Sequence, residues 1–157
     1  MEPKKVSESC IEIIQQMTQA EANLAGNVHG GVIMKYIDNT AGIVATRHTQ
    51  RNCVTASVDR IDFHHPVYIG DLLHVKSSVN YVGKSSMEIG VRVEAENFIT
   101  GEVRHTASAY LTFVSLDEYG KPVPVPDAIF ETDIEKQRNK EAAERKRIRL
   151  AARKDCN

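Results

Sequence analysis

Asp38 is the residue whose setting most suggests chemistry. It stands inside an apolar stretch, residues 36–44 (YIDNTAGIV). A carboxylate in such a stretch is costly to bury unless it is paired, hydrogen-bonded or functional. Burial also makes its pKa sensitive to the surroundings, which suits a general base or a nucleophile. The alternative is a structural carboxylate that accepts hydrogen bonds from a loop or a neighbouring subunit. The apolar surroundings favour the functional interpretation.

The loop before Asp38, residues 26–31 (GNVHGG), is the second stretch suited to chemistry. Gly30 and Gly31 would open a helix and leave free N–H groups at its positive end. With no side chains there, an anion or a carbonyl oxygen can approach the backbone closely, as in an oxyanion hole. A plain helix-capping turn is the alternative, and spacing alone favours it. His29 either lines a pocket or is a structural turn residue.

The sequence lacks the motifs of several common classes of enzyme. No HExxH, GxSxG or GxxxxGK[ST] pattern occurs, so zinc hydrolase, serine hydrolase and nucleoside-triphosphate chemistry lack a motif. His64 and His65 are consecutive on a strand and would point to opposite faces, so they cannot chelate one metal. The three cysteines, Cys10, Cys53 and Cys156, have no CxxC spacing and indicate reduced thiols.

Length and charge indicate one near-neutral domain. The chain has 157 residues, with 20 Lys and Arg against 21 Asp and Glu and a net charge of −1. This balance argues against an overall basic nucleic-acid binder. Residues 131–157 carry nine basic and six acidic side chains and predict a weakly basic tail. Residues 1–20 lack a signal-peptide core, and no apolar run is long enough to span a membrane. We therefore expect a cytoplasmic protein without a membrane span or a nucleic-acid partner.

Hydrophobic periodicity predicts the elements that position these residues. A strand is expected at 10–17, a loop at 23–31 and a helix from 31 to 48. Four strands follow at 54–63, 73–81, 87–95 and 103–114, with a bulge near Asp59 and Arg60 and hairpin turns at residues 83–84 and 100–101. The proline-rich segment 121–126 suits an extended linker, and residues 131–153 suit a solvated, partly docked helix. A ligand-steering role for its basic run, residues 145–147, is the less favoured reading.

The predicted helix is apolar on nearly every side, which is typical of a helix buried on all sides. A single sheet that curls around it covers only one side. The other side needs a partner, and a second copy of the chain is the simplest one. The pattern therefore predicts an α+β fold, in which an antiparallel sheet curls around a long buried helix, and a homodimer.

Residues 23–35 (NLAGNVHGGVIMK) and 37–42 (IDNTAG) resemble the signature of hotdog-fold acyl-CoA thioesterases. The nearest branch is the cytosolic, brain-type acyl-CoA hydrolases and their bacterial relatives. Further matches lie at residues 54–59, 63, 66–67, 70–71, 83–87 and 116–126. The likeness covers about residues 10–130 and implies a hotdog domain at 1–126 with a charged helical tail at 127–157. It also implies a homodimer that assembles further into a trimer of dimers, a homohexamer.

The resemblance implies hydrolysis of a fatty acyl-CoA to a free fatty acid and CoA, without a metal or any cofactor beyond CoA as a substrate moiety. Asp38 would act as general base or nucleophile, and Asn27 of the facing subunit would position water or substrate. The amides of Gly30 and Gly31 would polarise the thioester carbonyl. CoA would run along the dimer groove and contact a turn that includes Lys84. The complete set of substrate-binding residues expected is His29, Gly83, Lys84, Ser85 and Ser86.

Two other functions stay open at this stage. A non-catalytic acyl-CoA sensor would use the same groove, although such modules usually carry a DNA-binding segment and the short N-terminus holds no helix-turn-helix. A hotdog dehydratase would need a catalytic histidine before the helix. His29 keeps this reading open, and the pair Asn27 and Asp38 argues against it.

Overall fold

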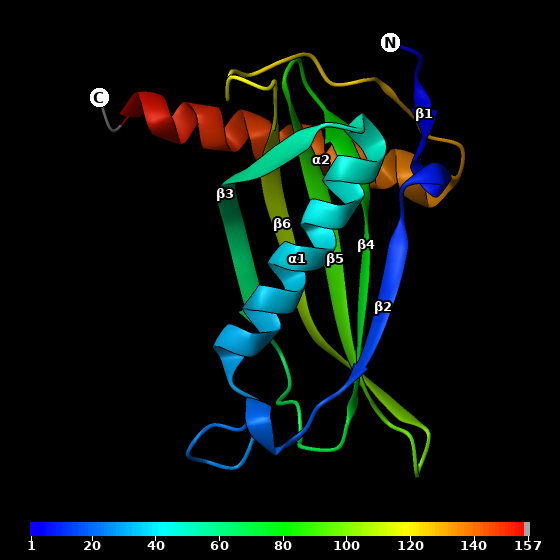
Figure 1. Cartoon of the computed structure of the whole chain (residues 1–157), viewed down its shortest axis with the longest axis vertical. Helices are drawn as coiled ribbons and strands as arrows, with labels where there is room; N and C mark the ends of the chain where they lie inside the picture. The colour runs from blue at the N-terminus through cyan, green and yellow to red at the C-terminus, as the bar shows by residue number, and fades with distance from the viewer. Residues whose placement is uncertain (156–157) are drawn as a thin grey trace.

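The computed structural model describes residues 1–155, so Cys156 lies outside the described residues. Its main sheet has five strands in the order β2-β4-β5-β6-β3, and all neighbouring pairs are antiparallel. The sheet curves around one side of a long helix, α1 (Gly30–Thr49), as Figure 1 shows. The strands are β2 (Ile11–Gln16), β3 (Asn52–Phe63), β4 (Leu72–Val82), β5 (Ser86–Asn97) and β6 (Glu102–Leu116). The predicted hotdog fold is confirmed.

The core lies between α1 and the concave face of the sheet. The helix contributes a stripe at spacings of three and four, which includes Ile33, Ile37 and Val44. Every second residue of β6 faces it, as period two requires, with Ala107, Ala109, Leu111 and Phe113 almost fully buried. The buried residues of the helix follow a helical spacing and those of β6 follow a strand spacing. This is why both elements could be predicted from the sequence.

The bulge predicted near Asp59 and Arg60 is confirmed, because the register of β3 against β6 shifts between Val58 and Ile61. A second shift, between Thr55 and Ser57, was not predicted. β3 forms an edge of the sheet, and most of its residues are exposed. The two register shifts bend β3 along the edge of the sheet.

The N-terminal segment and the linker hold the end of α1. A short strand β1 (Lys4–Lys5) pairs in parallel with β7 (Ala128–Ile129), and this small sheet was not predicted. Two short 3-10 helices, Val6–Glu8 and Gln19–Glu21, flank β2. His48, fully buried in the last turn of α1, contacts the Pro126 carbonyl oxygen through Nε2 at 2.7 Å. The linker therefore packs on the helix end.

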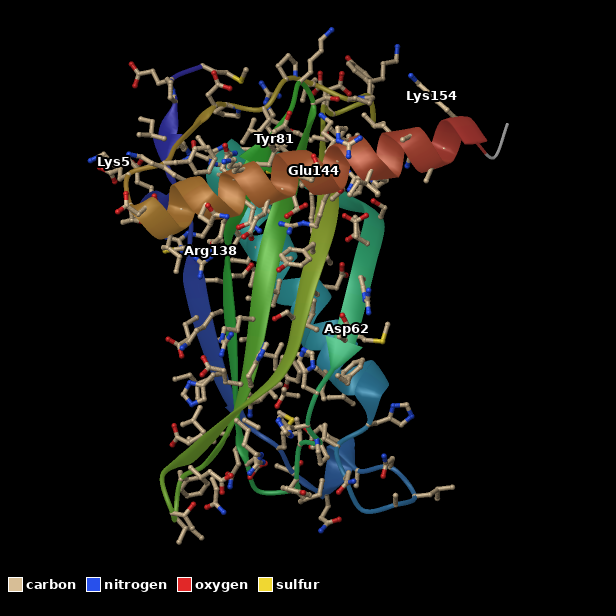
Figure 2. All side chains as sticks on the ribbon, turned by 180° about the vertical axis from the view of Figure 1, so that it is seen from behind. Lys5, Asp62, Tyr81, Arg138, Glu144 and Lys154 are labelled. Carbon is tan, nitrogen blue, oxygen red and sulfur yellow. The ribbon has the colours of Figure 1, made fainter. Side chains whose placement is uncertain are left out.

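The tail forms α2 (Asp133–Asp155), which crosses the convex face of the sheet (Figure 2). Ala142 is buried there, and the Arg145 guanidinium lies 3.6 Å from the centre of the Tyr110 ring. The same guanidinium binds both oxygens of Glu88, a residue only 4% exposed. The partial docking predicted for this helix is therefore confirmed. Among residues 1–155, no helix has the length and apolar character of a membrane span.

Candidate active site

Asp38 lies on the side of α1 that the sheet leaves uncovered. Its side chain is exposed, as are Met34 one turn earlier and Ile43 farther around the helix. Asp38 is therefore not buried within a single chain, which accords with the prediction that one curled sheet covers only one side of this helix. The reason is that one curved sheet covers only the stripe of α1 that contains Ile33, Ile37 and Val44. The helix has one buried face and one open face, and Asp38 stands on the open one.

A threonine on the edge strand orients the Asp38 carboxylate. Thr55 Oγ1 of β3 donates a hydrogen bond to Asp38 Oδ1 at 2.6 Å. This length is typical of a strong O–H···O⁻ bond to an ionised carboxylate. One carboxylate oxygen is thus held, which leaves Oδ2 to meet water or substrate. The sequence did not single out Thr55, because a contact between residues 17 positions apart on different elements has no local pattern.

The pair stands in an open groove of about 450 Å³ between α1 and β3. Its lining combines the polar side chains of Asp38 and Thr55 with apolar surface from Ile43 and Phe113. Gly42 also borders the groove, where a β-carbon would make an ordinary contact with Phe113 Cε1 at 3.7 Å. A groove with one oriented carboxylate and an apolar wall suits a ligand with a polar reacting group and a hydrocarbon chain.

Cys53 borders the same groove but is a poor nucleophile. Burial raises the pKa of its thiol, and its Sγ contacts Thr49 Oγ1 at 3.2 Å. The thiol form therefore dominates at neutral pH, and the thiolate that would attack a substrate is scarce. Asp38 is the better candidate for the chemistry in this groove.

The N-terminus of α1 is capped by its own loop. His29 is the N-cap residue, and its Nδ1 accepts a hydrogen bond from the Gly31 N–H at 3.0 Å. Among residues 1–155, the Gly30 N–H has no protein acceptor, and Gly30 borders a hollow of about 220 Å³ together with Phe63 and His65. Gly30 is thus the freer donor of the two glycines, and His29 has a capping role.

The loop residues that precede the cap are held by Asn23. Its Oδ1 accepts from the N–H groups of Ala25 and Asn27 at 2.9 and 3.1 Å. Because two backbone donors identify this atom as the oxygen, the amide nitrogen of Asn23 is the opposite end, and among residues 1–155 it has no protein acceptor. Asn27 takes part through its backbone, with its carbonyl oxygen accepting from the Asn23 N–H at 2.7 Å. The structure therefore adds Asn23 to the candidate donors, and its fixed amide has no signature in the sequence.

One chain does not bring all the predicted residues together. Asp38 lies eight residues beyond Gly30, about 12 Å along the helix at 1.5 Å per residue. One carbonyl group cannot contact both of them. The turn Gly83–Ser86 connects β4 to β5 and does not line the groove. It is linked to the groove only through the neighbouring strand β6. Its Ser85 oxygen accepts from the N–H of Ser115, whose register partner is the groove residue Cys53.

Within the described residues, no group of three or more His, Cys, Asp or Glu side chains could hold a metal ion. His64, which directly follows β3, and His105 of β6 illustrate this. The His64 and His105 rings lie 5.1 Å apart, but His105 Nε2 contacts the Ser108 hydroxyl and the Ala107 oxygen.

The sequence and the fold of this chain are similar to those of known proteins. Residues 25–101 match the model of the thioesterase superfamily. A rat cytosolic acyl coenzyme A thioester hydrolase is 42% identical over 89% of this chain, and the chain spans only 37% of that relative's length. A hexameric acyl-CoA thioesterase in its apo form has a TM-score of 0.94, at 35% identity, over 97% of both chains. An acyl-CoA hydrolase from Staphylococcus aureus, in complex with butyryl-CoA, CoA and CoA disulfide, has a TM-score of 0.91 at 37% identity, over 98% of this chain and 93% of that one.

The chain therefore belongs to the hotdog-fold acyl-CoA thioester hydrolases of the thioesterase superfamily. Three further structures of the Staphylococcus aureus enzyme each have one residue replaced by alanine: an asparagine, an aspartate and a threonine. In that chain the asparagine and the aspartate are 15 positions apart, and the aspartate and the threonine 17. Asn23, Asp38 and Thr55 have the same two separations here.

Proposed function

We propose that this protein hydrolyses the thioester bond of acyl-CoA molecules, fatty acyl-CoA among them, in the groove between α1 and β3. The observation that carries the proposal is the Asp38 carboxylate, held through one oxygen by Thr55 and open to the groove through the other. Asp38 Oδ2 takes a proton from water as the water oxygen attacks the thioester carbonyl. The tetrahedral intermediate then expels the CoA sulfur, and the proton returns to that sulfur. The products are a carboxylic acid and CoA.

Within one chain the amides of Gly30 and Gly31 lie too far along α1 from Asp38 to meet the same carbonyl group. We propose that a second copy packs its α1 and β3 against the open face, so that the loop and helix start of one copy face Asp38 of the other. The amides of Gly30 and Gly31 would then polarise the thioester carbonyl, with Gly30 the freer donor. A homodimer made this way has two equivalent sites, and a trimer of dimers accords with the hexameric relative.

The asparagine that completes the site has two candidates. The sequence indicates Asn27, and the free amide end of Asn23 gives that residue a fixed donor. The match in separations to the three altered residues of the Staphylococcus aureus enzyme also favours Asn23. Separate Asn23→Ala and Asn27→Ala variants distinguish them. The variant that loses kcat identifies the catalytic asparagine. Because Asn23 Oδ1 also holds two backbone amides, Asn23→Asp, which keeps this acceptor, separates a loss of catalysis from a loss of loop structure.

Release of free thiol from acyl-CoA substrates of different chain lengths tests the proposed activity. We expect steady-state release by the parent protein, and its profile over chain length reports the acyl preference. Binding of acyl-CoA without release of CoA would refute hydrolysis and favour the sensor instead. Water addition to an enoyl-CoA without thiol release would favour the dehydratase.

A further inference from the structure

A β-bulge in β6 turns one arginine toward the core side of the sheet. The register of β6 against β5 skips Thr106, so Arg104 lies opposite Ala95, which is fully buried. Residues directly opposite each other share a face of the sheet. With strict alternation along β6, Arg104 would instead share the outer face with Tyr110, which contacts α2. The bulge therefore places a charged side chain on the inner side of the sheet.

Arg104 meets Asp71, the residue directly before β4. Arg104 Nη2 donates a hydrogen bond to Asp71 Oδ2 at 2.7 Å, and the two side chains are only 17% and 7% exposed. Removal of one partner from such an ion pair leaves an uncompensated charge with little access to water. The same Asp71 Oδ2 accepts from the Tyr68 N–H at 3.0 Å, and the guanidinium carbon lies 5.0 Å from the centre of the Tyr68 ring. One carboxylate thus joins β6 to the turn of residues 68–71.

This turn holds the segment that leads into α1. The Val28 N–H donates to the Val67 oxygen at 2.9 Å, and Asn27 forms an antiparallel bridge with Tyr68. The two segments lie side by side at the end of the molecule where α1 begins (Figure 1). Gly30 follows Val28 by two residues and opens the helix. The placement of the Gly30 N–H and of both candidate asparagines therefore depends on this turn.

Asp71 is the group through which Arg104 acts. The other carboxylate near the guanidinium belongs to Glu102, whose Oε1 lies 3.9 Å from Arg104 Nη1 and whose side chain is 62% exposed. Water screens an ion pair of this kind, and its contribution is small. The Nε atom of Arg104 is buried and has no acceptor among residues 1–155. The bond to Asp71 therefore carries most of the interaction of this side chain.

We infer that Arg104 is a positioning residue for the hydrolysis proposed above, on which this inference rests. Through Asp71 it fixes the loop and the helix start that offer donors to the facing subunit. These donors act on charge that develops in the transition state, so a displaced loop lowers kcat and leaves KM nearly unchanged. A displacement of about 1 Å costs about 10² in rate, and loss of the ion pair should therefore lower kcat at least about tenfold.

The test compares Arg104→Met with Arg145→Met in the full-length protein. Arg145 of α2 makes a similar pair with Glu88 on the outer face of the sheet, at 2.6 Å, so its loss also leaves a buried carboxylate unpaired. We expect both variants to lose stability in urea unfolding. Only Arg104→Met should lose kcat, at least about tenfold, with KM within about twofold of the parent. Because the pair uses a single N–H···O bond, Arg104→Lys should recover most of the kcat.

A second variant keeps the test decisive if Arg104→Met does not fold. Asp71→Asn retains an oxygen that can accept the Tyr68 N–H and loses the charge that binds Arg104. It should also lower kcat without a change in KM, and its effect should not multiply with that of Arg104→Met in the double variant. An unchanged kcat in either single variant, multiplied effects in the double variant, or an equal loss of kcat in Arg145→Met would overturn the inference.

Hydrogen exchange separates this failure from a failure of the proposed function. The bond from the Val28 N–H to Val67 should open more often in Arg104→Met, so the Val28 amide should exchange at least about tenfold faster than in the parent or in Arg145→Met. If the parent hydrolyses no thioester, the proposed function fails, and faster exchange at Val28 still supports the positioning of the loop by Arg104. Unchanged exchange at Val28 overturns it.

Discussion

The hydrogen bond from Thr55 Oγ1 to Asp38 Oδ1 defines how the replacement Asp38→Asn should behave. Asparagine has nearly the same size and keeps an oxygen that can accept the Thr55 hydroxyl proton. It loses the negative charge and the ability to take a proton from water. The variant thus removes the base and leaves the local geometry in place.

The expected effect is large for catalysis and small for folding. A positioned general base contributes about 10² to 10⁴ in rate. We therefore expect kcat to fall about 10³-fold, which corresponds to about 4 kcal/mol in activation free energy. Because Asp38 is exposed, the free energy of unfolding should change by less than about 0.5 kcal/mol. Thiol release measures the first quantity and urea unfolding the second.

A double variant gives the control. Asn39 is the next residue in α1 and also lines the groove. Asp38→Asn combined with Asn39→Asp restores the same net charge about 100° around the helix, where it cannot meet Thr55. We expect this double variant to remain inactive. Retention of kcat within threefold by Asp38→Asn, or recovery by the double variant, would refute the role of Asp38 as an oriented base.

Three further predictions follow from the same contacts. Thr55→Val should lower kcat about tenfold, because the hydrogen bond to the Asp38 carboxylate is lost, whereas Thr55→Ser should keep most of the activity. Equal rates of thiol release by the two variants would contradict the role of the Thr55 hydroxyl in orienting Asp38. Val58→Lys places a charge on the exposed edge strand β3 and should lower the molar mass of the assembly measured by light scattering. Val103→Lys, at a similarly exposed position at the start of β6, should leave that mass unchanged. An unchanged mass for Val58→Lys would count against association through β3. Burial lowers the pKa of His48, so in the unfolded chain this ring takes up a proton at a higher pH than in the folded protein. The free energy of unfolding should therefore fall as the pH drops below about 6.5, the ordinary value of histidine. This fall, measured by urea unfolding, should be smaller for His48→Gln, and an identical pH profile for the two proteins would refute it.

The order of elements was predictable because each has a strong local pattern. The stripe of Ile33, Ile37 and Val44 has helical spacing, and alternate residues of β6 have strand spacing. Both patterns follow from which side chains face one core, and this information is local in the sequence. The small sheet β1–β7 could not be predicted in this way, because two-residue strands that are far apart in the chain have no period.

Individual site residues were predictable to different degrees. Asp38 was found because a carboxylate is unusual in an apolar helix. Thr55 and Asn23 were not, because a threonine on a strand and an asparagine in a loop are ordinary residues there. Their importance comes from what they contact: the Asp38 carboxylate for Thr55, and two backbone amides for Asn23. An open face of this helix was predicted, because one sheet covers only one side of it, but only the structure showed that Asp38 lies on that face.

The sequence by itself determined the order of strand, helix and four strands, the bulge in β3 and the presence of a docked tail helix, because periodicity, turn residues and helix propensity are local properties. Only the tertiary structure decided which partners meet. It brought Thr55 to Asp38 across 17 residues, and it brought Arg104 of β6 to Asp71 across 33 residues. Contacts between distant residues depend on how the sheet curves and where α2 crosses it. These are consequences of packing the whole chain, and no segment encodes them alone.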